Sequence, residues 1–190
     1  MLKNALVEHC SPTLAGIKTG NMFSVSNDLT DLLSEIRELN RIMTSRGLRL
    51  IPLRRSDKRT LIYLYRPDYL KKDLDLPEAQ EILEEKGYPC GNPDFCIARL
   101  IKHLVEDEQF PHEIGLFLGY PPSDVKGFMT DTRKGVKCNG CWKAYSNECE
   151  AKELFDKYKK CREIYRREAK EGKPLEAVIV DTRKELRPAI

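Results

Sequence analysis

The chain has 190 residues, of which 41% are hydrophobic and 33% are charged, and its formal net charge is +3. This composition is typical of a globular protein that buries a core, and the small net charge gives no sign of a nucleic-acid partner. No apolar run approaches the roughly 20 residues of a membrane helix, and the N-terminus lacks the apolar core of a signal peptide. We therefore expect a cytoplasmic protein with no membrane segment, whose seven cysteines stay reduced.

Two kinds of pattern are visible in the first half of the chain. Residues 28–46 repeat apolar side chains at helical spacing, and Gly47 follows at the position that often ends a helix. Two strand-like runs come next, residues 48–54 and 60–66. The second run is apolar on both faces, which predicts a central strand, whereas Pro52 in the first run predicts an edge strand or a bulge. Residues 15–25 are a weaker third candidate, because two glycines interrupt them.

The second half of the chain reads as mostly helical. Prolines at 77, 93, 111 and 122 each stand where a helix is expected to begin, and residues 75–78 resemble a capping box. A last long helix is predicted from residue 148 to residue 170. The expected fold is therefore α+β, with a small antiparallel sheet of about three strands packed with five to six helices. We expect one domain over residues 1–172 and a charged tail over residues 173–190.

The cysteines differ in their surroundings. Cys161 lies on the apolar stripe of the last helix and Cys96 lies beside that of an earlier one, so both are predicted to be core residues. Cys138 and Cys141 are separated by Asn139 and Gly140, a spacing that lets a turn aim both sulfurs at one zinc or iron ion or join them as a redox pair. A structural zinc site needs four ligands, and the other two would have to come from Cys90, Cys96, Cys149 or the histidines. The other interpretation is that Cys138 and Cys141 are two ordinary thiols in a loop. Cys90 and Cys149 have no predicted role of their own.

Cys10 is the candidate nucleophile. Pro12 is expected to hold Ser11 extended, which would leave Cys10 at a kink after a short N-terminal helix. The adjacent His9 is a poor base for it, whereas His112 stands at the predicted first turn of a helix. A Cys10–His112 pair oriented by Glu113 or Asn21 would have the parts of a thiol hydrolase or transferase, and the alternative is a structural role for Cys10.

Two further stretches of the sequence support weaker hypotheses about function. Residues 111–129 superficially resemble a helix-turn-helix, but the second helix is short and offers only Lys126 to DNA, so nucleic-acid binding is not expected. Four cations surround one acid in the predicted hairpin loop, which is typical of a solvated turn but would also suit a protein partner. The cations are Arg54, Arg55, Lys58 and Arg59.

The segments HCSPTLAGIKTGNMFS, FCIARL, FPHEIGLFLGYPPSDVKGF and CWKAY resemble an uncharacterised family, a domain of unknown function found in anaerobic, clostridia-type bacteria. The resemblance runs from about His9 to Tyr165 and carries no activity that can be transferred. It implies that one set of residues belongs to the family pattern, whereas Cys138 and Cys141 are less tied to it. That set is Cys10, Pro12, Lys18, His112, Glu113, Gly119, Tyr120, Pro121, Trp142 and Tyr145.

Two functions remain open from the sequence. The first is a small-molecule site built from Cys10, Lys18, His112 and Glu113, acting through thiol chemistry. The second is a non-catalytic metal-binding or adaptor protein that uses the Cys138–Cys141 loop and the basic hairpin of residues 54–59. Whether the protein is an enzyme is undecided between them.

Overall fold

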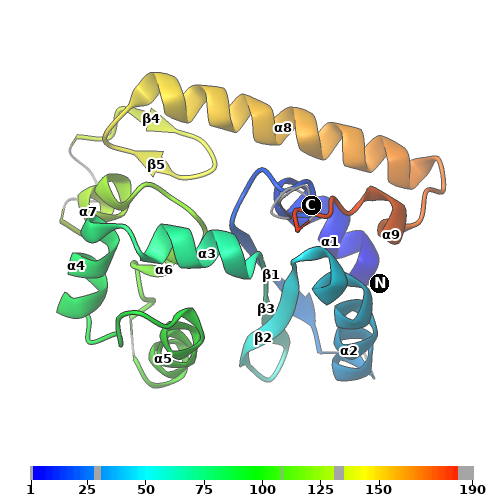
Figure 1. Cartoon of the computed structure of the whole chain (residues 1–190), viewed down its shortest axis with the longest axis horizontal. Helices are drawn as coiled ribbons and strands as arrows, with labels where there is room; N and C mark the ends of the chain where they lie inside the picture. The colour runs from blue at the N-terminus through cyan, green and yellow to red at the C-terminus, as the bar shows by residue number, and fades with distance from the viewer. Residues whose placement is uncertain (1, 28–30, 108, 131–134, 184–190) are drawn as a thin grey trace, which may run out of the picture. The chain divides into compact units, whose positions relative to one another are not determined.

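The computed structural model describes residues 2–27, 31–107, 109–130 and 135–183. Among these residues the chain forms nine α-helices, one 3₁₀ helix and five strands (Figure 1). The α+β class with a small antiparallel sheet is confirmed, and the helices outnumber the expected five to six. The elements are α1 (Leu2–Leu14), β1 (Gly20–Ser26), α2 (Leu32–Met43), η1 (Thr44–Arg46), β2 (Arg49–Arg55), β3 (Arg59–Tyr65), α3 (Pro67–Leu74), α4 (Pro77–Glu85), α5 (Pro93–Glu106), α6 (Ile114–Phe117), α7 (Pro122–Thr130), β4 (Cys138–Asn139), β5 (Lys143–Ala144), α8 (Glu148–Lys170) and α9 (Leu175–Val178).

The described contacts group the chain into two compact units. The first unit consists of residues 1–68 and 160–190, and the second of residues 69–159. The division falls within helix α8, whose residues 148–159 belong to the second unit and 160–170 to the first. The expected division into a domain over 1–172 and a tail over 173–190 stays a prediction. No helix in the described part of the chain has the length and hydrophobicity needed to cross a bilayer.

The sheet of the first unit has the strand order β1-β3-β2, with both pairs antiparallel. The central position predicted for the second strand-like run is confirmed by β3, whose last four residues are all buried. The edge position and bulge predicted from Pro52 are also confirmed, because β2 is an edge strand and its register shifts between Pro52 and Arg54. Proline has no N–H to donate to a ladder, which restricts it to such positions.

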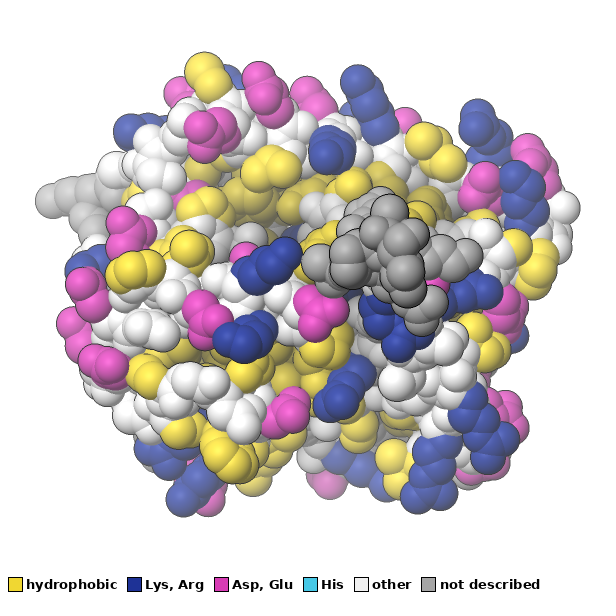
Figure 2. Space-filling model, in the orientation of Figure 1, with side chains coloured by type: hydrophobic (Ala, Val, Ile, Leu, Met, Phe, Trp, Pro, Cys, Tyr) yellow, Lys and Arg dark blue, Asp and Glu magenta, His cyan; other side chains and the backbone are white. Residues whose placement is uncertain are grey.

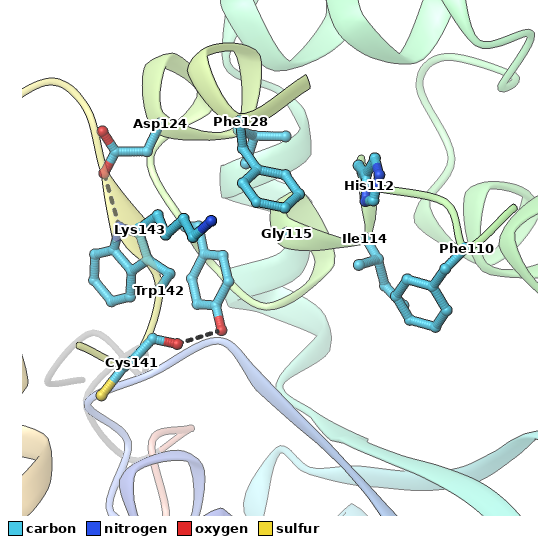
Figure 3. A pocket seen from close by; sticks show the side chains of 11 residues that line it. Phe110, His112, Ile114, Gly115, Asp124, Phe128, Cys141, Trp142 and Lys143 are labelled. Atoms are coloured by element: carbon cyan, nitrogen blue, oxygen red, sulfur yellow. Dashed lines mark hydrogen bonds between the residues drawn. The ribbon is translucent and has the colours of Figure 1, made fainter. Parts of the chain in front are cut away.

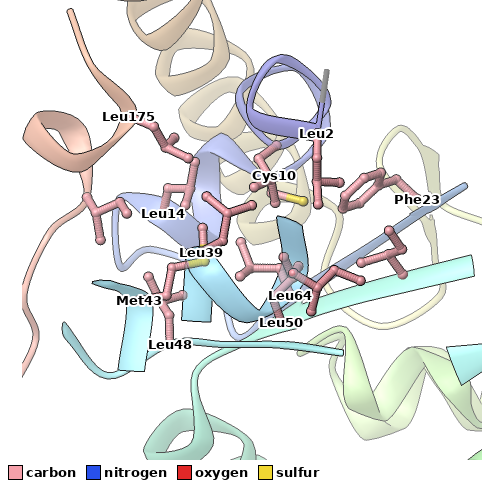
Figure 4. Packing of buried hydrophobic residues seen from close by; sticks show 14 of the residues in the cluster. Leu2, Cys10, Leu14, Phe23, Leu39, Met43, Leu48, Leu50, Leu64 and Leu175 are labelled. Carbon is pink, nitrogen blue, oxygen red and sulfur yellow. The ribbon is translucent and has the colours of Figure 1, made fainter. Parts of the chain in front are cut away.

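The core of the first unit lies between α1, α2 and the sheet (Figure 4). Helix α1 buries Leu2, Leu6, Cys10 and Leu14, one residue per turn of the same face. The predicted break before Pro12 is wrong, because α1 continues through Pro12 to Leu14. A proline removes one helical hydrogen bond, but the buried stripe reaches into the next turn and its packing outweighs that loss.

Helix α2 agrees with the sequence pattern in its described part. Residues 28–30 of the predicted helix lie outside the described residues, and α2 begins after Asp31. The predicted end is confirmed, since Gly47 has a φ of 77° and caps η1 in the left-handed conformation. That conformation strains any residue with a Cβ, which is why glycine suits this position.

A buried arginine ties the first unit together. Arg66 follows β3 and is only 1% exposed. Its donors point at carbonyl oxygens near the end of α1, where the helix carries a partial negative charge, and at the segment after α9. The acceptors are the carbonyls of Thr13 (2.8 Å), Leu14 (2.9 Å), Val180 (2.9 Å) and Arg46 (3.3 Å), and the hydroxyl of Thr182 (2.8 Å).

The second unit contains α3 to α7, the β4–β5 hairpin and the first part of α8. The helix start predicted at Pro93 is confirmed by α5, which the Asn92 side chain caps by accepting a hydrogen bond from the Asp94 amide at 2.9 Å. The predicted capping box before α4 is wrong, since Leu76 is the capping residue and no side chain caps this helix. The predicted bounds of the last helix agree with α8 at both ends.

Candidate functional site

Cys10 and Lys18 both lie in the first unit, away from solvent. Cys10 is fully buried, and its sulfur lies among the apolar side chains of the core (Figure 4). Burial raises the pKa of the Cys10 thiol, and the nearby positive charge of Lys18 offsets only part of this effect. Lys18 is 6% exposed and donates a hydrogen bond to the carbonyl of Gly20 at 2.6 Å. Cys10 is therefore a protonated core thiol at neutral pH, and its role as a nucleophile stays a prediction that this environment does not favour.

His112 and Glu113 are neighbours in the second unit but have different surroundings. His112 is exposed, and its ring meets that of Phe128 edge-on at 4.9 Å. Glu113 is 4% exposed and accepts a hydrogen bond from the Tyr88 hydroxyl at 2.8 Å. Its Oε1 also lies 3.3 Å from Nδ1 of His103, a histidine that the sequence did not single out. The carboxylate of Glu113 is thus directed at His103 and Tyr88, and no described contact joins it to His112.

Asp124 of the second unit accepts four hydrogen bonds from three residues. It lies in the first turn of α7 and is 3% exposed. Burial opposes its ionisation, but four hydrogen bonds to the carboxylate outweigh that cost and hold the pKa of Asp124 below its usual value. The donors are Nε1 of Trp142 (2.8 Å), the amides of Tyr145 (2.8 Å) and Ser146 (2.8 Å), and the hydroxyl of Ser146 (2.7 Å).

The Cys-x-x-Cys segment forms the tip of the β4–β5 hairpin. Cys138 pairs with Ala144 across the hairpin, and Cys141 is exposed in the turn. Gly140 lies under the ring of Phe155, where an added Cβ would come within 2.2 Å of that ring. No group of three or more His, Cys, Asp or Glu residues in the described part of the chain is arranged to hold a metal ion. The predicted zinc or iron site therefore has no third ligand among the described residues.

A pocket of about 370 Å³ lies beside this hairpin, and we call it the aromatic pocket (Figure 3). Apart from its rings, it is lined mainly by small and aliphatic residues of α6 and α7, and its charged groups are Asp124 and Lys143. The carboxylate of Asp124 points toward the indole of Trp142 (Figure 3). The rings that line the pocket are those of Phe110, His112, Tyr120, Phe128 and Trp142.

Several rings of the aromatic pocket are held in place by neighbouring side chains. Tyr120 stacks on Trp142 with ring centres 4.7 Å apart, and Phe155 of α8 meets the same indole edge-on at 4.6 Å. The Tyr120 hydroxyl donates to the carbonyl of Cys141 at 3.3 Å. Lys143 places its ammonium 5.4 Å from the centre of the Phe128 ring. These contacts fix the wall formed by Trp142, because its indole is constrained by both Tyr120 and Phe155.

A second, polar hollow of about 680 Å³ shares Phe110 and His112 with the aromatic pocket. His103, Asp107 and Glu113 also line it. His112 therefore lies where an apolar cavity meets a polar one. Of the predicted catalytic set, the second unit brings together only His112 and Glu113. Both line the polar hollow, and only His112 also lines the aromatic pocket.

The basic hairpin tip forms part of the first unit. Its four cations are exposed, and Arg59 donates a hydrogen bond to the carbonyl of Ser24 at 2.9 Å. Over the face shown in Figure 2, basic and acidic side chains are interspersed, with hydrophobic side chains between them. Docking of a protein partner through residues 54–59 stays a prediction.

The pocket residues that the sequence did not predict as a site include Asp124, Phe128 and Lys143. For Asp124 and Phe128 the available signal is the dense aromatic and glycine content of residues 110–128. The glycines permit close packing, since an added Cβ on Gly127 would come within 2.6 Å of the Tyr145 ring. Tyr120 and Trp142 were named through the family resemblance, without a role.

Comparison with known proteins identifies a family for this chain. A family model described as a protein of unknown function (DUF3793) matches residues 6–179. Neither the curated proteins nor the solved structures gave a match. The expected resemblance to a domain-of-unknown-function family is confirmed, and an origin in anaerobic bacteria stays an expectation. Because the model covers most of the sequence, the chain belongs to the DUF3793 family of proteins of unknown function.

Proposed function

We propose that this protein binds a small planar aromatic molecule in the aromatic pocket of its second unit. The observation that carries the proposal is a cavity of about 370 Å³ whose walls are largely aromatic rings. Its volume lies within the range of roughly 300–1,000 Å³ that is usual for ligand pockets. Stacked and edge-on aromatic contacts favour a flat ligand, because each such pair contributes about 0.5–1.5 kcal/mol beyond the area buried.

The pocket is organised before a ligand arrives. The hydrogen bond from Trp142 to Asp124 and the stack of Trp142 on Tyr120 hold the indole in one orientation. Side chains that are already ordered lose little further freedom on binding, so less of the contact energy is spent on ordering them. The order of these side chains favours a ligand site and argues against a mere gap between loosely packed side chains.

His112 is the predicted site residue that this proposal retains. Its imidazole lines both the aromatic pocket and the polar hollow, so it can contact a polar substituent of the ligand. Cys10 has no part in the proposed site, because its thiol is buried in the first unit. A thiol-dependent hydrolase or transferase activity stays a prediction from the sequence, and ligand binding does not depend on it.

The single tryptophan of the chain makes the proposal directly testable. Trp142 lines the pocket, so its indole N–H gives one assignable peak in a ¹H–¹⁵N correlation spectrum. We expect titration with neutral 2-naphthamide to shift this peak to saturation. Removing the Phe128 ring in Phe128→Ala should weaken binding about tenfold, a loss of about 1.4 kcal/mol.

Phe95→Ala provides the matched control. Phe95 belongs to the same unit, is 62% exposed on α5 and does not line the aromatic pocket. This variant should bind 2-naphthamide as the unmodified protein does. If no aromatic probe moves the indole peak, or if both variants lose binding equally, the proposal is wrong.

A further inference from the structure

The charged groups of the aromatic pocket are not equivalent toward a ligand. Asp124 is the only carboxylate of the lining among the described residues, and Lys143 is the only lysine. Their surroundings decide which sign of charge the pocket accepts.

The carboxylate of Asp124 is occupied by the protein itself. Two backbone amides, one hydroxyl and one indole N–H donate to its oxygens, and a carboxylate has about four acceptor positions. It is directed at the indole and the residues that follow β5, as Figure 3 shows for the bond to Trp142. Three of the donors reach Oδ1 and the indole N–H reaches Oδ2, so most of the acceptor capacity that a cationic ligand would need is used within the protein.

The cationic side of the pocket lies around Phe128. The ammonium of Lys143 lies over the Phe128 ring at 5.4 Å, and the imidazole of His112 meets the same ring edge-on. Both side chains can donate hydrogen bonds, because an ammonium carries three N–H donors and an imidazole carries at least one. Two donors that contact one aromatic wall are suited to an acidic substituent on a ring packed against that wall.

We infer that the pocket selects aromatic carboxylates, an inference that rests on the proposed binding function. Lys143 and His112 recognise the carboxylate, and the rings hold the aromatic part. A hydrogen bond between charged partners is about twice as strong as a neutral one, and the low polarity of the surrounding walls strengthens it further. An aromatic acid should therefore bind about tenfold more tightly than its neutral amide.

The test compares 2-naphthoate with 2-naphthamide at pH 7.5, with the Trp142 indole peak as readout. The two probes share one ring system and differ in charge, so their affinity ratio measures recognition of the carboxylate. We expect a ratio of about ten in favour of the acid. In Lys143→Gln the acid should lose most of this advantage, while the amide binds as before.

Lys126→Gln is the control for a general loss of positive charge. Lys126 is on α7 beside the pocket but does not line it. This variant should keep the preference for the acid. The ratio measured on the unmodified protein does not depend on the folding of any variant.

The outcomes separate the two proposals. If acid and amide bind equally, the aromatic pocket is a ligand site but selection of carboxylates is wrong. If only the amide binds, the inference is again overturned. If neither probe binds, the proposed function fails and this inference fails with it. An equal loss of the preference in Lys126→Gln and Lys143→Gln would assign the effect to overall charge and would also contradict the inference.

Discussion

Asp124 accepts a hydrogen bond from Nε1 of Trp142 over 2.8 Å, and this bond joins the start of α7 to the wall of the aromatic pocket. Both partners are nearly inaccessible to water, with exposed fractions of 3% and 8%. The same carboxylate caps the backbone after β5. A single acid thus sets the position of the indole and the course of the chain that carries it.

Replacing Asp124 with Ala should destabilise the second unit by roughly 3 kcal/mol, because several buried donors lose a charged acceptor at once. Urea denaturation followed by Trp142 fluorescence measures this change. Asp94→Ala is the matched control, since Asp94 stands in the first turn of α5 but is exposed. A loss below about 0.5 kcal/mol in Asp124→Ala would show that these hydrogen bonds contribute little.

The same carboxylate predicts a pH dependence. The folded pKa of Asp124 lies below its ordinary value of 3.8. The unfolded chain then binds a proton more readily, so the stabilisation is fully present above the unfolded pKa and is lost as the pH falls through the folded pKa. Asp124→Asn should lack this contribution. Urea titrations of both proteins in the acidic range should converge as the pH falls, and parallel curves would contradict the prediction.

Cys10 should behave as a core thiol. It is fully buried and its pKa is raised by burial, so iodoacetamide should alkylate it only after unfolding. Cys90 and Cys149 are exposed and serve as internal controls that react in the native state. Mass spectrometry of peptides from briefly labelled protein measures the rates. Labelling of native Cys10 as fast as Cys149 would restore the nucleophile hypothesis.

The contributions to stability of Glu113, Tyr88 and His103 should be coupled. Glu113→Gln leaves the phenol and the imidazole without a charged acceptor, and we expect a loss of roughly 1–3 kcal/mol. A double-mutant cycle with Tyr88→Phe should give a coupling free energy above about 0.5 kcal/mol, because the two side chains share one hydrogen bond. Glu106→Gln is the control on an exposed acid of the same hollow. Additive effects would mean that the contact is energetically unimportant.

Arg66→Lys should destabilise the first unit by roughly 2–4 kcal/mol, since lysine cannot reproduce five donors in a planar fork. Arg55→Lys, on the exposed hairpin, should change stability by less than about 0.5 kcal/mol. Circular dichroism during urea denaturation measures the free energy of unfolding of both variants. Hydrogen exchange of the backbone amides of residues 179–182 reports whether this segment detaches from the side chain at position 66. Equal stability of the two variants would contradict the role given to Arg66.

Elements with a long local repeat were predictable from the sequence. The bounds of α8 followed from apolar residues at helical spacing, and the central position of β3 followed from apolar residues on both of its faces. Gly47 and Pro52 were also informative, because the backbone freedom of glycine and the backbone restriction of proline apply wherever these residues stand. In contrast, Pro12 misled the prediction for α1, since tertiary burial of a stripe that includes Cys10 outweighed a local preference.

The candidate site was less predictable, because it depends on which side chains meet. His112 and Glu113 are adjacent in the sequence, yet Glu113 is directed at Tyr88 and His103. The acid that shapes the aromatic pocket is Asp124, and it meets Trp142 across 18 positions of the chain. No local pattern encodes such a pair.

The sequence by itself determined the α+β class, the order of the main helices and strands, and the membership of a family that spans nearly the whole chain. The fold class and the order of the elements follow from periodicity and from residues with special backbone preferences, which act over a few neighbours. The family membership follows from the match of the sequence to the family model. Only the tertiary structure decided that Cys10 is buried in a core and that the aromatic pocket forms around His112, Lys143 and Trp142. Burial and hydrogen bonding between distant segments control both outcomes, and these forces arise only when the chain is packed.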